Sequence, residues 1–215
     1  MKKILFYSSI CAGLMAFTHI ASRYHDGWVS LFDGKSLAGW KVGDNASTFQ
    51  VDSGMIIVHG NTAHLFYDGD VHQHHFKNFE FRADVMTRPG ANSGIYFHTE
   101  FQQGGWPAKG YEVQVNNSHT DWRRTGSLYG IKDIKEVYVK DNEWFTEYIR
   151  VVGKRVIIQL NGKTVVDYTE PENVLQQRDK GDSLRVISSG TFALQGHDPN
   201  SIVYFKNIMV RPLPD

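Results

Sequence analysis

The chain has 215 residues and carries 23 basic against 23 acidic side chains, so its formal net charge is zero at neutral pH. It therefore presents no strong positive field to a polyanion, and nucleic acid and anionic membrane surfaces are not expected partners. Hydrophobic residues make up 41% and charged residues 21%, a balance typical of a globular chain rather than a disordered one. Aromatic residues reach 13%, and they occur beside 20 glycines. This combination favours an all-β protein with an aromatic-lined surface.

The first segment has the pattern of an export signal. Residues 1–3 include two lysines, and an apolar run follows from Ile4 to Ile20. This pattern predicts a signal peptide over residues 1–22; the alternative is a membrane anchor, for which the run is barely long enough. Cys11, the one cysteine of the sequence, lies in this segment, so the mature chain would hold no disulfide. We therefore expect a periplasmic or secreted protein, or one at the bacterial cell surface, without membrane contact after cleavage.

From residue 49 onward, apolar and polar residues alternate with the period of two that β-strands show. Asn161-Gly162 lies between two such stretches and is the strongest short-range signal for a hairpin. One short helix is expected over residues 171–178. The alternation predicts strands over residues 49–51, 55–59, 79–86, 93–100, 111–116, 145–152, 155–160, 163–168, 191–195 and 202–211.

These strands suggest one compact unit. No repeat of 20–50 residues and no low-complexity linker interrupts the sequence, so residues 23–215 are expected to form a single domain. Many short strands at this spacing predict an all-β fold, a two-sheet jelly-roll β-sandwich.

Three of the predicted strands separate an apolar face from a face of hydrogen-bonding groups. The alternative interpretation is a solvated face, but such faces are usually rich in Lys, Glu and Thr. Amides, imidazoles and phenols beside aromatic rings are what a sugar site needs, and so the pattern favours a carbohydrate-binding cleft. The polar positions are Tyr96, His98 and Glu100 on the first strand, Glu112, Gln114 and Asn116 on the second, and Gln195 and His197 on the third.

Short sequence blocks also follow one another in an order typical of one protein family. They cover residues 31–40, 92–97, 110–114, 125–130, 160–163, 190–197 and 203–208. Together they resemble the 3-keto-disaccharide hydrolase family over residues 29–213. The resemblance implies a concanavalin A-like jelly roll. It also implies an exported enzyme that cleaves the glycosidic bond of a 3-keto sugar.

The chemistry that the resemblance implies requires few groups. A ketone at C3 acidifies the C2 proton, so a base can remove that proton, the aglycone leaves by elimination, and water then adds. Such a route needs a base, a group that polarises the ketone oxygen and an acid for the leaving oxygen. Paired glycosidase carboxylates are not required. Related sandwich glycanases often carry Glu-x-Asp-x-x-Glu, where this chain has amides in residues 112–117 and keeps Glu112 alone.

The resemblance and the polar faces together define the candidate site. Glu112 is expected as the base or as a metal ligand, and His98 and His197 as acid/base groups or ligand partners. Gln114 and Gln195 are expected to orient hydroxyls or the ketone oxygen. Further substrate-binding residues are expected to be the stacking side chains Tyr96, Tyr129 and Trp144, together with Lys109 and Asn92.

Two positions depart from the family pattern. The family often has Arg where His98 stands, and Trp-Asn where Trp144-Phe145 stands. These departures indicate a subgroup with an altered substrate.

A histidine-rich segment and a glycine-rich segment lie outside these strands. The His72-x-His74 spacing on a strand would place two imidazoles on one face, as some metal sites require, but a polar loop is favoured. Residues 104–107, Gly-Gly-Trp-Pro, predict a mobile loop tip that could act as a lid. No cofactor is assigned, and a divalent metal stays an open alternative. The runner-up function is a non-catalytic carbohydrate-binding domain of lectin type, and a structural or adhesive domain is third.

Overall fold

The computed structural model describes residues 24–177 and 184–215. The predicted signal peptide, residues 1–22, lies outside the described residues, as does Arg178 at the end of the predicted helix. Within the described ranges, no helix is both long enough and apolar enough to span a membrane.

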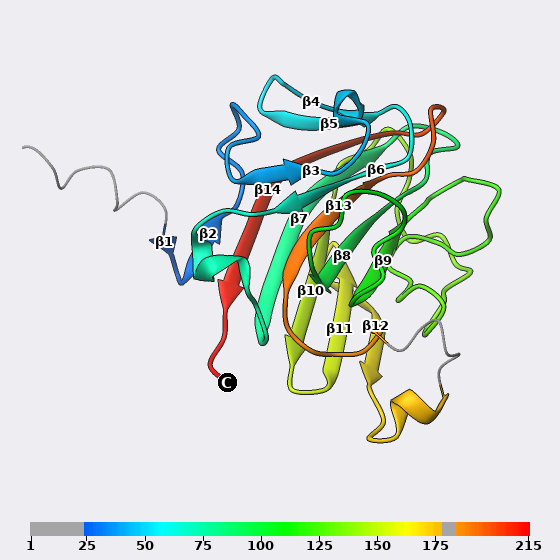
Figure 1. The fold of residues 1–215 in the computed structure, drawn as a ribbon. Coiled ribbons are helices and arrows are strands. Elements are labelled where there is room, and N and C mark those ends of the chain that lie inside the picture. The colour runs from blue at the N-terminus through cyan, green and yellow to red at the C-terminus, as the bar shows by residue number, and fades with distance from the viewer. Residues whose placement is uncertain (1–23, 178–183) are drawn as a thin grey trace, which may run out of the picture.

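Two antiparallel sheets pack against each other as a sandwich (Figure 1). The larger sheet has the order β1-β2-β14-β7-β10-β11-β12, and the β4–β5 hairpin joins it through β14. The smaller sheet has the order β3-β6-β13-β8-β9. The predicted all-β, two-sheet jelly-roll sandwich is thereby confirmed.

The bounds of the elements are as follows. The larger sheet contains β1 (Tyr24–His25), β2 (Trp28–Ser30), β4 (Phe49–Asp52), β5 (Met55–His59), β7 (Phe79–Thr87), β10 (Phe145–Val152), β11 (Arg155–Leu160), β12 (Lys163–Thr169) and β14 (Ile202–Pro212). The smaller contains β3 (Trp40–Val42), β6 (Ala63–Tyr67), β8 (Ser93–Thr99), β9 (Tyr111–Val115) and β13 (Thr191–Gly196). Short 3₁₀ turns occur at η1 (Ala46–Thr48), η2 (Val71–His74) and η3 (Val174–Gln177).

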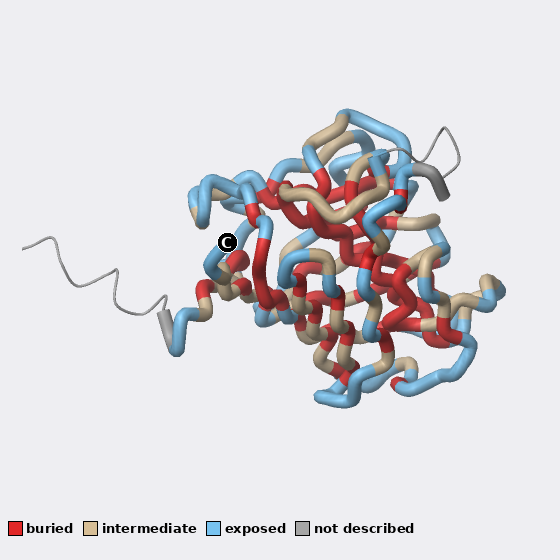
Figure 2. The backbone as a smooth tube through the Cα atoms, turned by 90° about the horizontal axis from the view of Figure 1, so that it is seen from below, coloured by how far each residue is buried: buried red, intermediate tan, exposed pale blue. Residues whose placement is uncertain are grey.

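The core lies between the sheets because alternate side chains of each strand point inward. Figure 2 shows buried backbone through the middle of the molecule and exposed loops around it. Phe79, Phe81 and Phe192 are fully buried, and the ring of Phe192 lies 4.9 and 4.7 Å from those of Phe79 and Phe81. Burying a phenylalanine side chain is worth about 1.5–3 kcal/mol. Much of the aromatic content therefore stabilises the core rather than lining a surface.

The predicted strands are found within one or two residues of their expected ends, but the prediction missed β6 and the three short strands β1, β2 and β3. The sequence of β6, Ala63-His64-Leu65-Phe66-Tyr67, shows no alternation because both faces of the strand are covered and all five residues are buried. The predicted short helix is reduced, among the described residues, to the single turn η3.

The segment around His72 and His74 forms a polar turn, as the favoured interpretation predicted. His72, Gln73 and His74 adopt left-handed backbone conformations with φ of 52°, 54° and 45°. None of them is buried, and His74 lies 3.8 Å from a carboxylate oxygen of Asp68.

Candidate active site

The outer face of the smaller sheet carries the predicted polar row, and loops cover it. Every residue of β8, β9 and β13 is buried, although alternate side chains point away from the core. Trp106, Pro107 and Ala108, from the loop that joins β8 to β9, border a cavity together with polar residues of these strands. The polar face is therefore enclosed rather than solvated.

This cavity, which we call the main pocket, has a volume of about 370 Å³. That is within the range of sites for small ligands. It is lined by Asn92, Tyr96, Trp106, Pro107, Ala108, Gly110, Glu112, Gln114, Asp121, Tyr129, Arg185, Gln195 and His197.

Glu112 is held by hydrogen bonds from two neighbouring strands. Tyr96 stands directly opposite Glu112 in the β8–β9 register, and its hydroxyl donates to Oε2 at 2.8 Å. Gln195 of β13 donates from Nε2 to Oε1 at 3.1 Å and also to the Tyr96 oxygen at 3.0 Å. Gly94 leaves the space that the carboxyl group fills, because a Cβ there would lie 2.9 Å from Cδ of Glu112. The network fixes both carboxylate oxygens.

The environment of Glu112 suits proton transfer near neutral pH. Burial raises the pKa of Glu112 to about 7, against the opposing effect of the hydrogen bonds from Tyr96 and Gln195. The catalytic pKa of a general base is best placed near the working pH. A buried carboxyl group with such a pKa in a cavity is a candidate catalytic group.

His197 is oriented by the residue that follows it. Its Nδ1 lies 2.8 Å from Oδ2 of Asp198, which also accepts a hydrogen bond from Ser201 Oγ at 2.7 Å. Burial acts to raise the pKa of Asp198, but hydrogen bonds from His197, Ser201 and the Asn200 amide outweigh it and lower the pKa. Because a carboxylate only accepts hydrogen bonds, Nδ1 carries a proton, and Nε2 is the ring nitrogen available for proton exchange.

His119 completes a group with the spacing of a metal site. Among the described residues, ligand atoms of His119, His197 and Asp198 lie within 4.8 Å of one another. Two imidazoles and a carboxylate are a donor set that divalent transition metals accept. However, both oxygens of Asp198 already accept hydrogen bonds from the protein. Asp198 therefore fits the role of a carboxylate that orients His197 better than the role of a metal ligand.

Two amide oxygens in the main pocket have no protein partner. Gln114 donates from Nε2 to Asn92 Oδ1 at 2.6 Å, and the Nε2 of Gln195 is also engaged. Their Oε1 atoms are buried and lack a hydrogen-bond partner among the described residues. Buried acceptors of this kind are costly unless a ligand donates to them. They fit hydroxyl groups, whereas a ketone oxygen would need a donor.

Comparison with known proteins places the chain in a family. The sequence model of the 3-keto-alpha-glucoside-1,2-lyase-like domain matches residues 27–211. The chain belongs to this family. A 3-keto-disaccharide hydrolase of Bacteroides thetaiotaomicron is 28% identical, in a match covering 66% of this chain and 59% of the relative. The chain thus spans less than two thirds of that relative's length. The resemblance seen in the sequence blocks is confirmed, and it supports a carbohydrate-related function.

Solved structures share the fold. A protein of Parabacteroides distasonis, provisionally described as a glycosyl hydrolase, superposes with a TM-score of 0.74 at 24% identity, covering 87% of this chain and 94% of that one. The carbohydrate binding module CBM66 of Bacillus subtilis gives a TM-score of 0.57 at 14% identity, covering 80% and 95%. The sandwich of the lyase-like domain family is thus common to proteins described as enzymes and as binding modules.

In this lyase-like domain, seven of the ten predicted site residues line the main pocket. The seven are Glu112, His197, Gln114, Gln195, Tyr96, Tyr129 and Asn92. The other three, His98, Trp144 and Lys109, do not.

The prediction that His98 faces the site is wrong because a β-bulge reverses its direction. Thr99 pairs with Thr191 and Phe97 with Phe192, so His98 is an extra residue between them, with φ of 56°. Its side chain is fully buried beside the rings of Phe79 and Phe97. Its Nε2 lies 2.9 Å from the Lys77 carbonyl oxygen. Burial lowers the pKa of His98 to about 4, which makes it a neutral structural residue.

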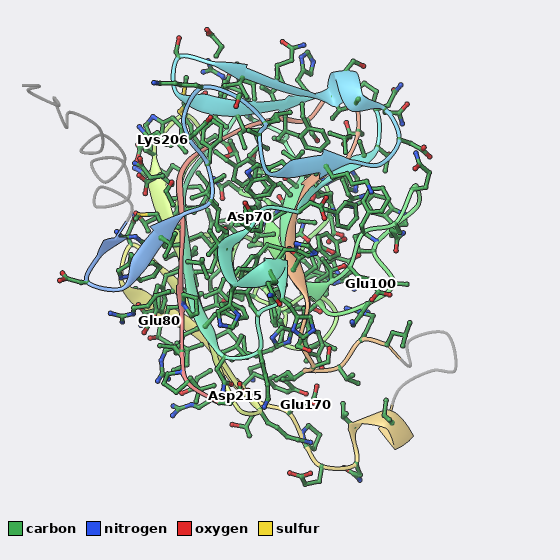
Figure 3. The ribbon with its side chains drawn as sticks, turned by 60° about the vertical axis from the view of Figure 1, so that its left-hand side comes forward. Asp70, Glu80, Glu100, Glu170, Lys206 and Asp215 are labelled. Atoms are coloured by element: carbon green, nitrogen blue, oxygen red, sulfur yellow. The ribbon has the colours of Figure 1, made fainter. Side chains whose placement is uncertain are left out.

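Trp144 and Lys109 also lie outside the main pocket. Trp144 precedes β10 in the larger sheet, and the Lys206 ammonium lies 3.9 Å from its ring centroid. Lys206 and Glu100, the residue after β8, are on opposite sides of the molecule (Figure 3). Lys109 forms an ion pair with Glu100 at 3.1 Å. Trp144 therefore cannot stack on a ligand in the main pocket, and Lys109 pairs with Glu100 instead of lining the pocket.

The sequence prediction missed several residues of the site. Asp198 could have been found, because it directly follows His197 and a His-Asp pair is a recognisable acid/base unit. Trp106 was assigned to a loop tip, and the structure places it in the wall of the main pocket. Asp121 and Arg185 lie in irregular segments, where no periodicity indicates which way a side chain points.

Proposed function

We propose that this protein is an exported enzyme that cleaves 3-keto-glycosides, with net hydrolysis by elimination and hydration. The observation that carries the proposal is Glu112, a single buried carboxyl group in the main pocket with a pKa raised to about 7. A base of this strength suits removal of a proton made acidic by an adjacent ketone. Family membership points to the same chemistry.

In the elimination step, the Glu112 carboxylate removes the proton from C2. The electron pair of the C2–H bond forms the C1=C2 double bond, and the C1–O bond to the aglycone breaks. The leaving oxygen keeps the electron pair of the broken C1–O bond and takes a proton from Nε2 of His197. Asp198 stabilises the charged imidazole ring that donates this proton, through its contact with Nδ1.

Hydration restores the two groups. Neutral His197 removes a proton from water, the resulting oxygen bonds to C1, and the carboxyl group of Glu112 returns its proton to C2. The sum is hydrolysis of the glycosidic bond, and each residue ends in its initial protonation state.

Other groups of the main pocket are suited to hold the oxidised sugar. The amide oxygens of Gln114 and Gln195 would accept hydrogen bonds from sugar hydroxyls. The guanidinium of Arg185, which donates to the Tyr129 carbonyl at 2.6 Å, supplies positive charge for the ketone oxygen as it becomes an enolate. The ring of Trp106 offers a stacking surface.

The test is turnover of a chromogenic 3-keto-glucoside. We expect the wild type to release the chromophore from it and to leave the unoxidised glucoside intact, since the latter has no acidic C2 proton. Glu112→Gln should lower kcat at least about a hundredfold. Glu100→Gln, the same change at an exposed position, serves as the control. A wild type that binds sugars but leaves the 3-keto-glucoside untouched would establish the carbohydrate-binding alternative.

A further inference from the structure

A second hollow lies next to the main pocket. It has a volume of about 280 Å³ and is bordered by three segments: Gly43–Asn45 after β3, Thr62–His64 at the start of β6, and Gln102–Gly105 in the loop after β8. Gln103 donates from Nε2 to Asp44 Oδ1 at 3.0 Å, which joins the first segment to the third.

One loop and one histidine separate this hollow from the main pocket. Residues 102–105 border the second hollow, whereas residues 106–108 of the same loop border the main pocket. The His64 ring borders the second hollow and packs edge-on against Tyr96 and Trp106 of the main pocket, with centroid distances of 5.4 and 5.5 Å. Thr62 donates from Oγ1 to the His197 carbonyl at 2.7 Å. The walls of the two cavities are therefore in direct contact.

The second hollow is suited to a neutral ligand rich in hydroxyl groups. His64 is only 4% exposed, and its Nε2 has no hydrogen-bond partner among the described residues. Burial, assisted by the nearby His197, lowers the pKa of His64 to about 4. A neutral imidazole can exchange hydrogen bonds with a hydroxyl as donor or acceptor. Asp44, Asn45 and Gln103 add further polar groups at the border.

We propose that the second hollow binds the leaving-group sugar of a 3-keto-disaccharide whose oxidised ring occupies the main pocket. This assignment rests on the proposed function. His197 is the reason for placing the leaving group here, because it would protonate the leaving oxygen, it lines the main pocket, and it contacts Thr62 at the border of the second hollow. Its ring lies 5.5 Å from that of Trp106, and its backbone is bonded to Thr62.

The test compares two substrates that differ only in the leaving group: a 3-keto-disaccharide and methyl 3-keto-glucoside. The measured quantity is the ratio of their kcat/KM values. We expect the wild type to prefer the disaccharide and the ratio to fall about fivefold to tenfold in Asp44→Ala and in His64→Leu, as loss of a hydrogen bond would produce. Asp52→Ala, an exposed aspartate in the β4–β5 hairpin, is the matched control and should keep the wild-type ratio.

The outcomes separate the two proposals. A wild-type ratio near one, or a ratio unchanged in both variants, overturns the assignment of the second hollow, while turnover of methyl 3-keto-glucoside still supports the proposed function. No turnover of either substrate overturns the proposed function and the assignment with it. Asp44 is exposed, so its variant tests the assignment even where the change at buried His64 prevents folding.

Discussion

Two opposing influences act on the carboxyl group of Glu112. Burial disfavours its charged form, and the hydrogen bonds from Tyr96 and Gln195 favour that form. With a pKa of about 7, the group is close to half ionised at neutral pH. The fraction that can act as a base therefore depends on each donor in its network.

Replacing Tyr96 with Phe should move the pH dependence of activity to higher pH. The base must be ionised, so the rising limb of kcat/KM at low pH should reflect the pKa of Glu112, about 7. Loss of the Tyr96 hydroxyl removes a donor that lowers the pKa of Glu112. The pKa then rises, and activity at pH 6 should fall more than activity at pH 8.5.

The measurement is kcat/KM from pH 5 to pH 9. Tyr129→Phe is the control, because Tyr129 lines the same pocket and, in the described structure, bonds to Glu112 only through its backbone amide, which the change leaves in place. If both variants show the wild-type profile, the group that titrates is not the Glu112 bonded to Tyr96.

The pair of His197 and Asp198 gives a second prediction, on the role of a metal. Asp198→Asn would reverse the hydrogen bond to Nδ1 and favour the wrong tautomer of His197, so kcat should fall about a hundredfold or more.

Dialysis of the wild type against EDTA should leave kcat unchanged. Activity that is lost on dialysis and restored by a divalent metal would instead make His119, His197 and Asp198 a metal site.

At the scale of elements, β8 carries the main structural constraint on the site. Gly94 leaves room for Glu112 across the β8–β9 pair. Because of the bulge, the side chain of His98 does not continue the outward-facing row that includes Tyr96. Gly190, beside the bulge, also leaves no space for a side chain, since a Cβ there would lie 2.8 Å from the backbone carbon of His98. Neighbouring atoms thus lie too close to β8 for any side chain at these two glycine positions.

Gly94→Ala tests this constraint. The added Cβ would push the Glu112 carboxyl group out of its network, and a displacement of about 1 Å can cost about a hundredfold in rate. Replacing Glu112 with Ala removes the side-chain atoms that the added Cβ would meet. We therefore expect Gly94→Ala to lower kcat strongly in the wild type but to change the residual kcat only slightly in a Glu112→Ala background. Equal losses in the two backgrounds would show that Gly94 acts elsewhere.

Period-two alternation was sufficient to predict most strands and the polar row of Glu112, Gln114 and Gln195. It failed at His98, because one inserted residue changes which face the following side chains occupy. It also failed for β6, where loops cover the outer face and so His64 shares a strand with apolar neighbours. Trp106 and Arg185 come to the site from irregular segments, whose course depends on tertiary contacts rather than on local pattern.

For the molecule as a whole, Glu147 conflicts with its apolar surroundings in the described interior. Glu147 of β10 points into the core between the sheets, paired in register with Ala83 and Leu160. It is fully buried, and neither carboxyl oxygen has a hydrogen-bond partner among the described residues. Burial raises its pKa well above the usual range, which keeps it protonated. It takes no part in the proposed chemistry.

Glu147→Leu should stabilise the protein, and more so at high pH. Folding raises the pKa of Glu147. The contribution of its protonation to the free energy of unfolding is therefore complete below 4.5, the pKa in the unfolded chain, and is lost as the pH rises toward the pKa in the folded protein. Leucine has a similar size and no polar atoms, so the free energy of unfolding should increase by about 1–3 kcal/mol at pH 8 and by less at pH 5.

Urea denaturation at both pH values measures the effect. Other groups whose pKa is changed by folding, such as Glu112 and Asp198, are present in both proteins, so their contributions cancel in the difference. If Glu147→Leu is less stable at pH 8, the carboxyl group has a partner in the folded protein, and the core is held together differently from a simple apolar sandwich.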